Sequence, residues 1–115
     1  MRISKELAKG STGLLVLSVL SRQELYGYQI IKTVELMSES VFQMNEGTLY
    51  PILHALEKEE LLSSYWADSP DTGKRRKYYK ITKKGLRELE MQKEEWETYQ
   101  KAVNRVIGGV QNAVG

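Results

Sequence analysis

The sequence predicts a mainly helical α+β domain, in which three helices precede one β-hairpin and a long helix follows it. Apolar residues recur at helical spacing in three stretches before residue 60 and again after residue 83. Between these stretches, residues 61–67 and 76–82 are rich in aromatic residues and are separated by turn-forming residues. A chain of 115 residues has room for one hydrophobic core, so a single domain is expected.

The first two predicted helices cover residues 14–20 and 25–37. The first, LLVLSVL, is apolar on nearly every side, which is typical of a helix buried in the core. Ser11 or Thr12 can cap its start. The second alternates apolar and polar residues at helical spacing, which indicates an amphipathic helix.

The third predicted helix covers residues 45–60. Its apolar stripe is formed by Leu49, Ile52, Leu53 and Leu56. Asn45 or Thr48 can cap it. With Thr48 as the cap, Pro51 would be the third helical residue, where its missing N–H costs little.

The predicted hairpin joins residues 61–67 to residues 76–82 through the turn-forming loop DSPDTGKR. Strand alternation assigns two sets of side chains to opposite faces: Tyr79 and Ile81 to one, and Tyr78, Lys80 and Thr82 to the other. Three helices followed by a hairpin form a winged helix, a relative of the helix-turn-helix DNA readers. Residues 1–82 are therefore expected to form a DNA-binding domain.

The last predicted helix covers residues 83–108, and residues 109–115 are expected to be a disordered tail. Its heptad-like seam consists of Leu86, Leu89, Lys93, Trp96, Gln100, Val103, Ile107, Val110 and Val114. Lys93 and Gln100 make this seam imperfect. Trp96, with Tyr99 one turn on, is either a core tryptophan or part of a dimer interface, and the interface is favoured because a domain of this size has little else to cover the seam.

Dimerisation through this helix would present two wings and two third helices to successive grooves of a palindromic site, about 34 Å apart. The residues expected to line the interface, or a pocket there for a planar aromatic effector, are Trp96, Tyr99, Leu89 and Val103. The alternative to a pocket is plain packing of aromatic residues at the interface.

Positive charge is concentrated in residues 74–87, KRRKYYKITKKGLR, which contain eight of the seventeen Lys and Arg residues and no Asp or Glu. Such focusing favours a polyanion, and double-stranded DNA is the leading candidate. The alternative is a solvated strand edge protected by lysines. Lys83 and Lys84 weigh against that alternative, because they lie in the first turn of a helix, where the macrodipole disfavours cations.

The side chains expected to contact DNA lie on the third predicted helix and on the predicted hairpin, which is the wing of the winged helix. In the third helix the polar candidates are Asn45, Thr48, Tyr50 and His54, since the acidic EKEE end leaves only the N-terminal half to approach DNA. In the wing they are Lys74, Arg75, Arg76, Lys77 and Lys80. Tyr50 and His54 have an alternative role in packing against neighbouring elements.

Other functions are not favoured. The chain has no cysteine and one histidine, which excludes thiolate metal sites and makes a zinc site a poor prospect. It shows no nucleophile–base pair and no glycine-rich phosphate loop, so neither an enzyme nor a cofactor is expected. The longest apolar run, residues 14–20, is far short of the ~20 residues of a membrane span. A cytoplasmic protein is expected, and the remaining rival is a winged helix that binds only proteins.

Four stretches together resemble the PadR-like family of bacterial winged-helix transcriptional regulators, which are mostly repressors. They are LYGYQI at 25–30, GTLYPILHALEK at 47–58, LLSSYW at 61–66 and GKRRKYYKITKKG at 73–85. The short chain is similar to the small branch of the family, whose last helix forms a homodimer. The resemblance thus implies a homodimeric repressor released from its operator by a small molecule.

The resemblance also implies roles for individual residues. Those matching the recognition-helix signature are Gly47, Thr48, Tyr50 and Pro51, and those matching the wing signature are Arg75, Arg76, Lys77, Tyr78 and Tyr79. Trp96 falls where some small members carry an aromatic residue that contacts planar ligands. Two residues depart from the pattern, because Ala55 stands where an Arg is usual and Glu60 replaces a Gly that forms a left-handed turn.

Overall fold

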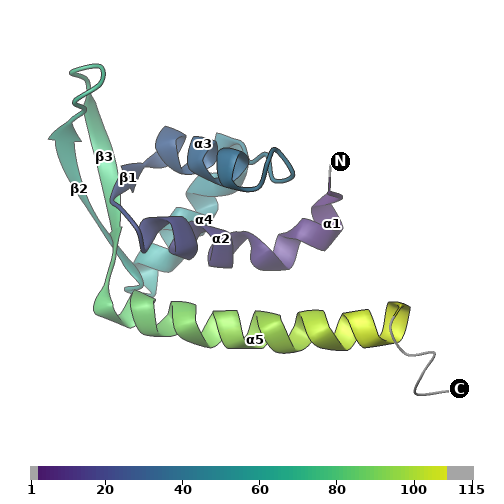
Figure 1. Ribbon diagram of the computed structural model, residues 1–115. Coiled ribbons are helices and arrows are strands. Elements are labelled where there is room, and N and C mark those ends of the chain that lie inside the picture. The colour runs from purple at the N-terminus through teal and green to yellow at the C-terminus, as the bar shows by residue number, and fades with distance from the viewer. Residues whose placement is uncertain (1–2, 109–115) are drawn as a thin grey trace, which may run out of the picture.

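The computed structural model describes residues 3–108, which fold in the predicted order of three helices, a hairpin and a long helix (Figure 1). Its elements are α1 (Lys5–Ala8), the 3₁₀ turn η1 (Lys9–Ser11), α2 (Thr12–Leu20), β1 (Leu25–Tyr26), α3 (Gly27–Met37), α4 (Glu46–Lys58), β2 (Leu62–Asp68), β3 (Arg75–Ile81) and α5 (Lys83–Ile107). The expected tail, with Val110 and Val114, lies outside the described residues.

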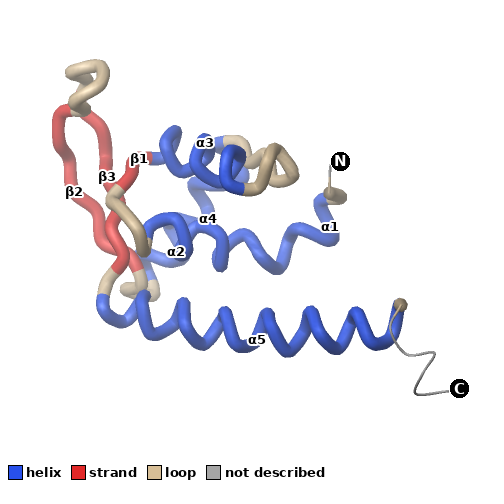
Figure 2. The backbone as a smooth tube through the Cα atoms, viewed as in Figure 1, coloured by secondary structure: helices blue, strands red, loops and turns tan. Residues whose placement is uncertain are grey.

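The winged-helix arrangement is confirmed, because α2, α3 and α4 pack together beside a three-stranded antiparallel sheet (Figure 2). The loop between β2 and β3 projects beyond the helices, and α5 runs along the opposite side of the molecule. The molecule is elongated, with extents of 62 × 31 × 21 Å. The wing and the far end of α5 therefore lie well apart.

The N-terminal helical region begins earlier than the sequence predicts. Neither Ser11 nor Thr12 caps α2 with its side chain, because both hydroxyls donate to the carbonyl of Ala8, at 3.0 and 3.3 Å. The helical path instead starts at Lys5, where Ser4 accepts a hydrogen bond from the N–H of Leu7. The prediction missed this extension because it contributes no buried residue.

The second predicted helix begins two residues later than expected. Leu25 and Tyr26 form the strand β1, which pairs with β3 in the register Leu25↔Tyr79 and Tyr26↔Tyr78. The N–H of Tyr26 donates to Oε1 of Gln29 and so closes the first turn of α3. With β1 on one side and β2 on the other, β3 is the central strand of the sheet.

The hydrophobic core lies between α2, α3, α4 and the inner face of the sheet. It includes Val16, Leu17, Ile30, Leu49, Leu53, Leu62, Tyr79 and Leu89. Leu89 is 1% exposed and packs in this core, so its assignment to an effector pocket or dimer interface is wrong. The first turns of α5 belong to the domain itself.

The start of α5 is bound to the end of α4, and we call residues 59–61 and 82–85 the α4–α5 joint. Thr82 caps α5 by accepting from the N–H of Gly85, while its hydroxyl donates to the carbonyl of Glu60 at 2.7 Å. The N–H of Thr82 donates to the carbonyl of Leu61 at 3.0 Å. Three short bonds thus fix the direction in which α5 leaves the domain.

Lys84 completes the α4–α5 joint. Its ammonium donates to the carbonyl of Glu59 at 3.0 Å, at the negative end of the α4 dipole. This contact explains a cation in the first turn of α5. Lys84 therefore gives no support to the inferred phosphate-facing surface, which stays a prediction.

The second residue after α4, Glu60, adopts a left-handed conformation, as the departure from the family pattern predicts. Glu60 has φ = 64°, and the N–H of Leu61 donates back to the carbonyl of Leu56 at 2.9 Å, which ends the helix in a Schellman turn. A left-handed conformation costs an L-residue with a Cβ about 1–2 kcal/mol. The turn is therefore made at some cost in stability.

Replacing Glu60 with glycine should raise the free energy of unfolding by about 1 kcal/mol, because glycine carries no such penalty. Urea denaturation measures the change. Glu59 provides a matched control, because it is the adjacent glutamate and has an ordinary φ of −83°. Glu59→Gly should lower stability, and equal effects of the two substitutions would contradict this account of the turn.

Candidate nucleic-acid interface

The recognition-helix candidate α4 is capped by Asn45 rather than by Thr48. The side chain of Asn45 accepts from the N–H of Thr48 at 2.9 Å, and helical residues begin at Glu46. Pro51 is therefore the sixth helical residue and not the third, so its cost is larger than predicted. An α-helix would bond the missing N–H of Pro51 to the carbonyl of Gly47.

The two sides of α4 have opposite roles. Leu49, Leu53 and Leu56 are buried in the core. The opposite side is open to solvent, and we define its exposed residues as the α4 face: Gly47, Thr48, Pro51, His54 and Ala55. The predicted contact residues on this helix are thus accessible. A shallow hollow bordered by His54 and Ala55 lies where the family pattern has the larger arginine.

Tyr50 lies at the edge of the α4 face and packs against the start of α3. A Cβ on Gly27 would come within 2.7 Å of the Tyr50 hydroxyl oxygen, so a larger residue at position 27 would displace the Tyr50 ring. The Tyr50 side chain is nevertheless 41% exposed. This position is compatible with both roles considered for Tyr50, packing on a neighbouring element and contact with DNA, since the ring packs on α3 and remains open to solvent.

The wing tip, residues 68–75, exposes the basic side chains of Lys74 and Arg75 together with the acidic side chains of Asp68 and Asp71. Gly73 turns the loop with φ = 72°, and the N–H of Ser69 closes it by donating to the carbonyl of Lys74 at 2.7 Å. Lys74, Arg75 and Lys80 are exposed. Arg75 lies 3.9 Å from Asp68, but both side chains are more than half exposed, so this ion pair is weak.

The next two basic residues of the wing are held by the protein. The guanidinium of Arg76 lies 5.1 Å from the centre of the Tyr26 ring, and its buried Nε has no partner among the described residues. The ammonium of Lys77 lies 4.0 Å from the carboxylate of Glu57 on α4, which also accepts from the hydroxyl of Ser64. The basic segment therefore divides into an exposed tip and an anchored base.

Tyr78 lies beneath the surface. It is 9% exposed, because its ring lies edge-on to Tyr26 at 5.5 Å and stacks on Tyr65 at 5.6 Å. The prediction that the Tyr78 side chain contacts DNA directly is therefore wrong, because this side chain is buried. The Tyr65 hydroxyl donates to the carboxylate of Glu24, and this hydrogen bond raises the pKa of Tyr65. The sequence offered no signal for the stack, because Tyr26 and Tyr65 come from strands far apart in the chain.

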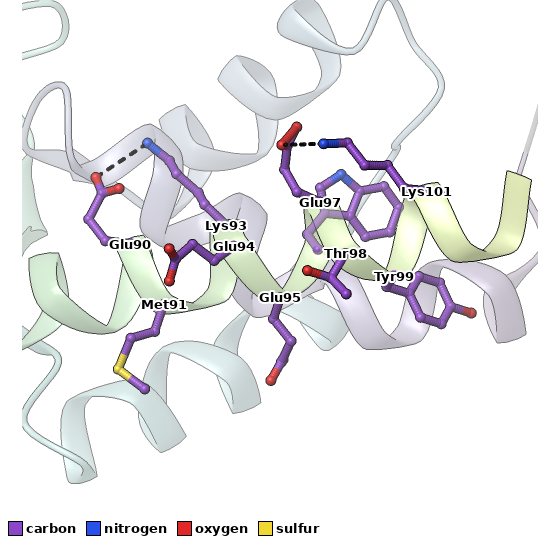
Figure 3. A pocket seen from close by; sticks show the side chains of 10 residues that line it. Glu90, Met91, Lys93, Glu94, Glu95, Glu97, Thr98, Tyr99 and Lys101 are labelled. Atoms are coloured by element: carbon purple, nitrogen blue, oxygen red, sulfur yellow. Dashed lines mark ion pairs between the residues drawn. The ribbon is translucent and has the colours of Figure 1, made fainter. Parts of the chain in front are cut away.

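Most of α5 is exposed beyond its first two turns. Trp96 is 45% exposed and Tyr99 is 59% exposed, with their rings stacked at 6.0 Å, whereas Val103 is half-buried. Figure 3 shows the hollow beside Tyr99, and its lining residues, Trp96 among them, all come from positions 90–101 of this one helix. Their side chains point in different directions around α5, so the hollow is an open helix surface rather than an enclosed cavity.

The fold and the exposed basic wing define a winged-helix regulator of transcription. Residues 16–91 match the transcriptional regulator PadR-like family, and the chain belongs to that family. Its family and structural neighbours are transcriptional regulators and not enzymes, as the sequence predicts. No helix among the described residues is long and apolar enough to cross a membrane.

Several solved structures share this fold over nearly their whole length. A PadR family transcription regulator of Clostridium difficile is 36% identical, with a TM-score of 0.74 over 86% of this chain and 100% of that one. A PadR-like regulator of Bacillus cereus is 33% identical, with a TM-score of 0.78 over 90% and 98% of the two chains. These similarities extend beyond the sheet to most of α5.

Two protein sequences are also similar. An uncharacterized protein of Lysinibacillus sphaericus is 29% identical over 109 residues, which are 95% of this chain and 99% of that protein. The transcriptional regulator YqjI of Escherichia coli is 28% identical over 100 residues, which are 86% of this chain. The chain spans about half of YqjI, since the match covers 46% of that protein.

Proposed function

We propose that the chain is a homodimeric repressor that binds double-stranded operator DNA through the α4 face and the wing tip. The observation that carries the proposal is the pairing, in one winged-helix domain, of the exposed α4 face with the exposed basic side chains of Lys74 and Arg75 at the wing tip. Residues 1–82 would bind DNA, and residues 83–108 would form the dimer. Asn45 would serve this surface by capping α4.

The proposed mode of binding assigns the two surfaces different tasks. The α4 face has side chains short enough to let the helix enter the major groove, where base edges are read. Lys74 and Arg75 would neutralise phosphates beside it and supply affinity without sequence preference. Arg76 and Lys77 would hold the wing at a fixed angle to α4 through Tyr26 and Glu57.

The dimer is supported by the exposed apolar face of α5. Trp96, Tyr99, Val103 and Val106 follow each other at intervals of three, four and three residues and so share one side of the helix. Val106 is 76% exposed, and such a row of apolar side chains is stabilised by covering it. A second copy is the partner that places two α4 faces on successive half-sites.

A small planar aromatic effector would bind beside Trp96 and Tyr99 at the dimer axis. It would release DNA only through different affinities for the two dimer arrangements. In a Trp66→Phe variant, fluorescence reports on Trp96 alone and should be quenched by such a ligand. A panel of planar aromatic compounds that leaves the signal unchanged would contradict the effector site.

DNA binding is tested by selecting sequences from a randomised duplex library with the intact protein. We expect enrichment of a palindromic site and a gel shift whose affinity falls steeply with salt. Binding that is insensitive to salt, together with no enriched sequence, would contradict the proposal. That outcome would favour the alternative of a winged helix that binds only proteins.

The dimer is tested by replacing Trp96 with glutamate. Burying a charge in place of a central aromatic side chain should weaken self-association about thirtyfold or more, as measured by light scattering over a concentration series. Met91→Glu is the control, because Met91 is also exposed but lies on another side of α5. A Trp96→Glu protein as dimeric as the wild type would contradict an interface at this position.

A further inference from the structure

Two residues of the α4 face, Gly47 and Pro51, weaken the helix that carries them. Gly47 is the second residue of α4, and Pro51 follows one turn later on the same exposed side. Glycine and proline are the two poorest helix formers. Local choices that oppose the fold and find no compensation within it are characteristic of functional positions.

No contact or backbone conformation within the described part of the protein requires a glycine at position 47. Gly73 is the one described glycine with a positive φ, so Gly47 needs no conformational freedom of that kind. A Cβ at Gly47 would meet only Oδ1 of Asn45, at an ordinary distance of 3.4 Å. Gly27 and Gly85 differ, because a Cβ at either would collide with its neighbours. Gly13 is equally open, so open space alone does not indicate a ligand contact; Gly47 differs because it lies on the α4 face one turn before Pro51, where a glycine would let the backbone approach a ligand closely.

Pro51 indicates which group of the protein such a ligand would contact, the main-chain carbonyl of Gly47. Because proline has no N–H, the carbonyl of Gly47 lacks the donor that an α-helix would supply from position 51. Gly47 itself carries no side chain to cover its carbonyl. The Gly47 carbonyl, in an exposed residue of the α4 face, is therefore an acceptor without its usual helical donor, and the Pro51 ring lies next to it.

The chemistry of the major groove restricts the partner of this acceptor. Phosphate oxygens are acceptors themselves, and the donors on the major-groove edges are N6 of adenine and N4 of cytosine. We propose that the Gly47 carbonyl accepts a hydrogen bond from the exocyclic amino group of adenine or cytosine in the operator. This inference rests on the proposed function, in which α4 enters the major groove.

The test uses an operator selected by the wild-type protein and all its single base-pair substitutions. Pro51→Ala and Pro51→Ile both restore the missing N–H, so each should raise the Tm and lose about fivefold discrimination at one base pair. Gly47→Ala should also raise the Tm and weaken operator binding about tenfold, because its methyl group holds the backbone away from the base.

Base analogues identify the amino group directly. At the affected position, purine in place of adenine, or 2-pyrimidinone in place of cytosine, removes the amino group alone. This change should weaken wild-type binding about fivefold and leave binding by Pro51→Ala unchanged. The analogue that produces the effect identifies the base.

Gly13→Ala is the matched control, because Gly13 is the second residue of α2 and a Cβ there would meet nothing within 4 Å. It should raise the Tm without changing DNA binding. Full discrimination in both Pro51 variants would overturn the inference, and so would a loss in Pro51→Ala alone, which would assign the contact to the proline ring. A wild-type protein that enriches no sequence would overturn the proposed function as well.

Discussion

Replacing Gly85 with alanine is expected to destabilise the protein by about 3 kcal/mol. The added Cβ would lie 2.2 Å from the carbonyl oxygen of Leu61 and 2.6 Å from Cγ1 of Ile81. The Leu61 carbonyl cannot move away without losing the hydrogen bond from Thr82. The substitution therefore opens the α4–α5 joint, and urea denaturation monitored by circular dichroism measures the loss.

Gly13→Ala is again the comparison, since it adds the same methyl group at a helical position with open space around it. It should raise stability slightly, because alanine is the better helix former. If Gly85→Ala unfolded at the wild-type urea concentration, the close approach of α5 to Leu61 would not exist in solution.

The double substitution Lys74→Ala with Arg75→Ala is expected to reduce the salt dependence of DNA binding. Each phosphate contact contributes about −0.9 to the slope of log K against log salt, so the slope should become shallower by about 2 for each protomer bound. The loss of affinity should be similar for operator and unrelated DNA, because phosphate contacts carry no sequence information. Fluorescence anisotropy over a salt series measures both quantities.

The control removes the same number of positive charges elsewhere. Lys93 and Lys101 on α5 lie 3.7 and 3.9 Å from Glu90 and Glu97 of their own helix. Substituting both with alanine should leave the slope almost unchanged. Equal slopes in the two double variants would show that net charge, and not the wing tip, governs the salt dependence.

The order of elements was predictable because it depends on local patterns. The apolar stripe of α4 and the choice of Asn45 or Thr48 as its cap are encoded within a few residues, whereas the left-handed turn at Glu60 was expected only from the family resemblance. The strand β1 is different. Its two residues, Leu25 and Tyr26, are extended only because Tyr78 and Tyr79 pair with them from a distant part of the chain.

The candidate site shows the same division between local and long-range information. Exposure of Pro51 and His54 followed from the periodicity of α4. The burial of Tyr78 and Leu89 did not, because it depends on which elements cover β3 and the start of α5. Counting charges could not show that Lys77 and Lys84 contact the protein itself, because the acceptors of both ammonium groups come from α4 and its C-terminal end.

The α4–α5 joint couples the direction of α5 to the C-terminal end of α4. Three consecutive carbonyls, those of Glu59, Glu60 and Leu61, bond to Lys84 and Thr82. A helix of 25 residues is a lever about 37 Å long, so a tilt of α5 against a second copy would carry α4 with it. In the proposed dimer, the separation of operator half-sites that the protein accepts would thus depend on the angle between the two α5 helices.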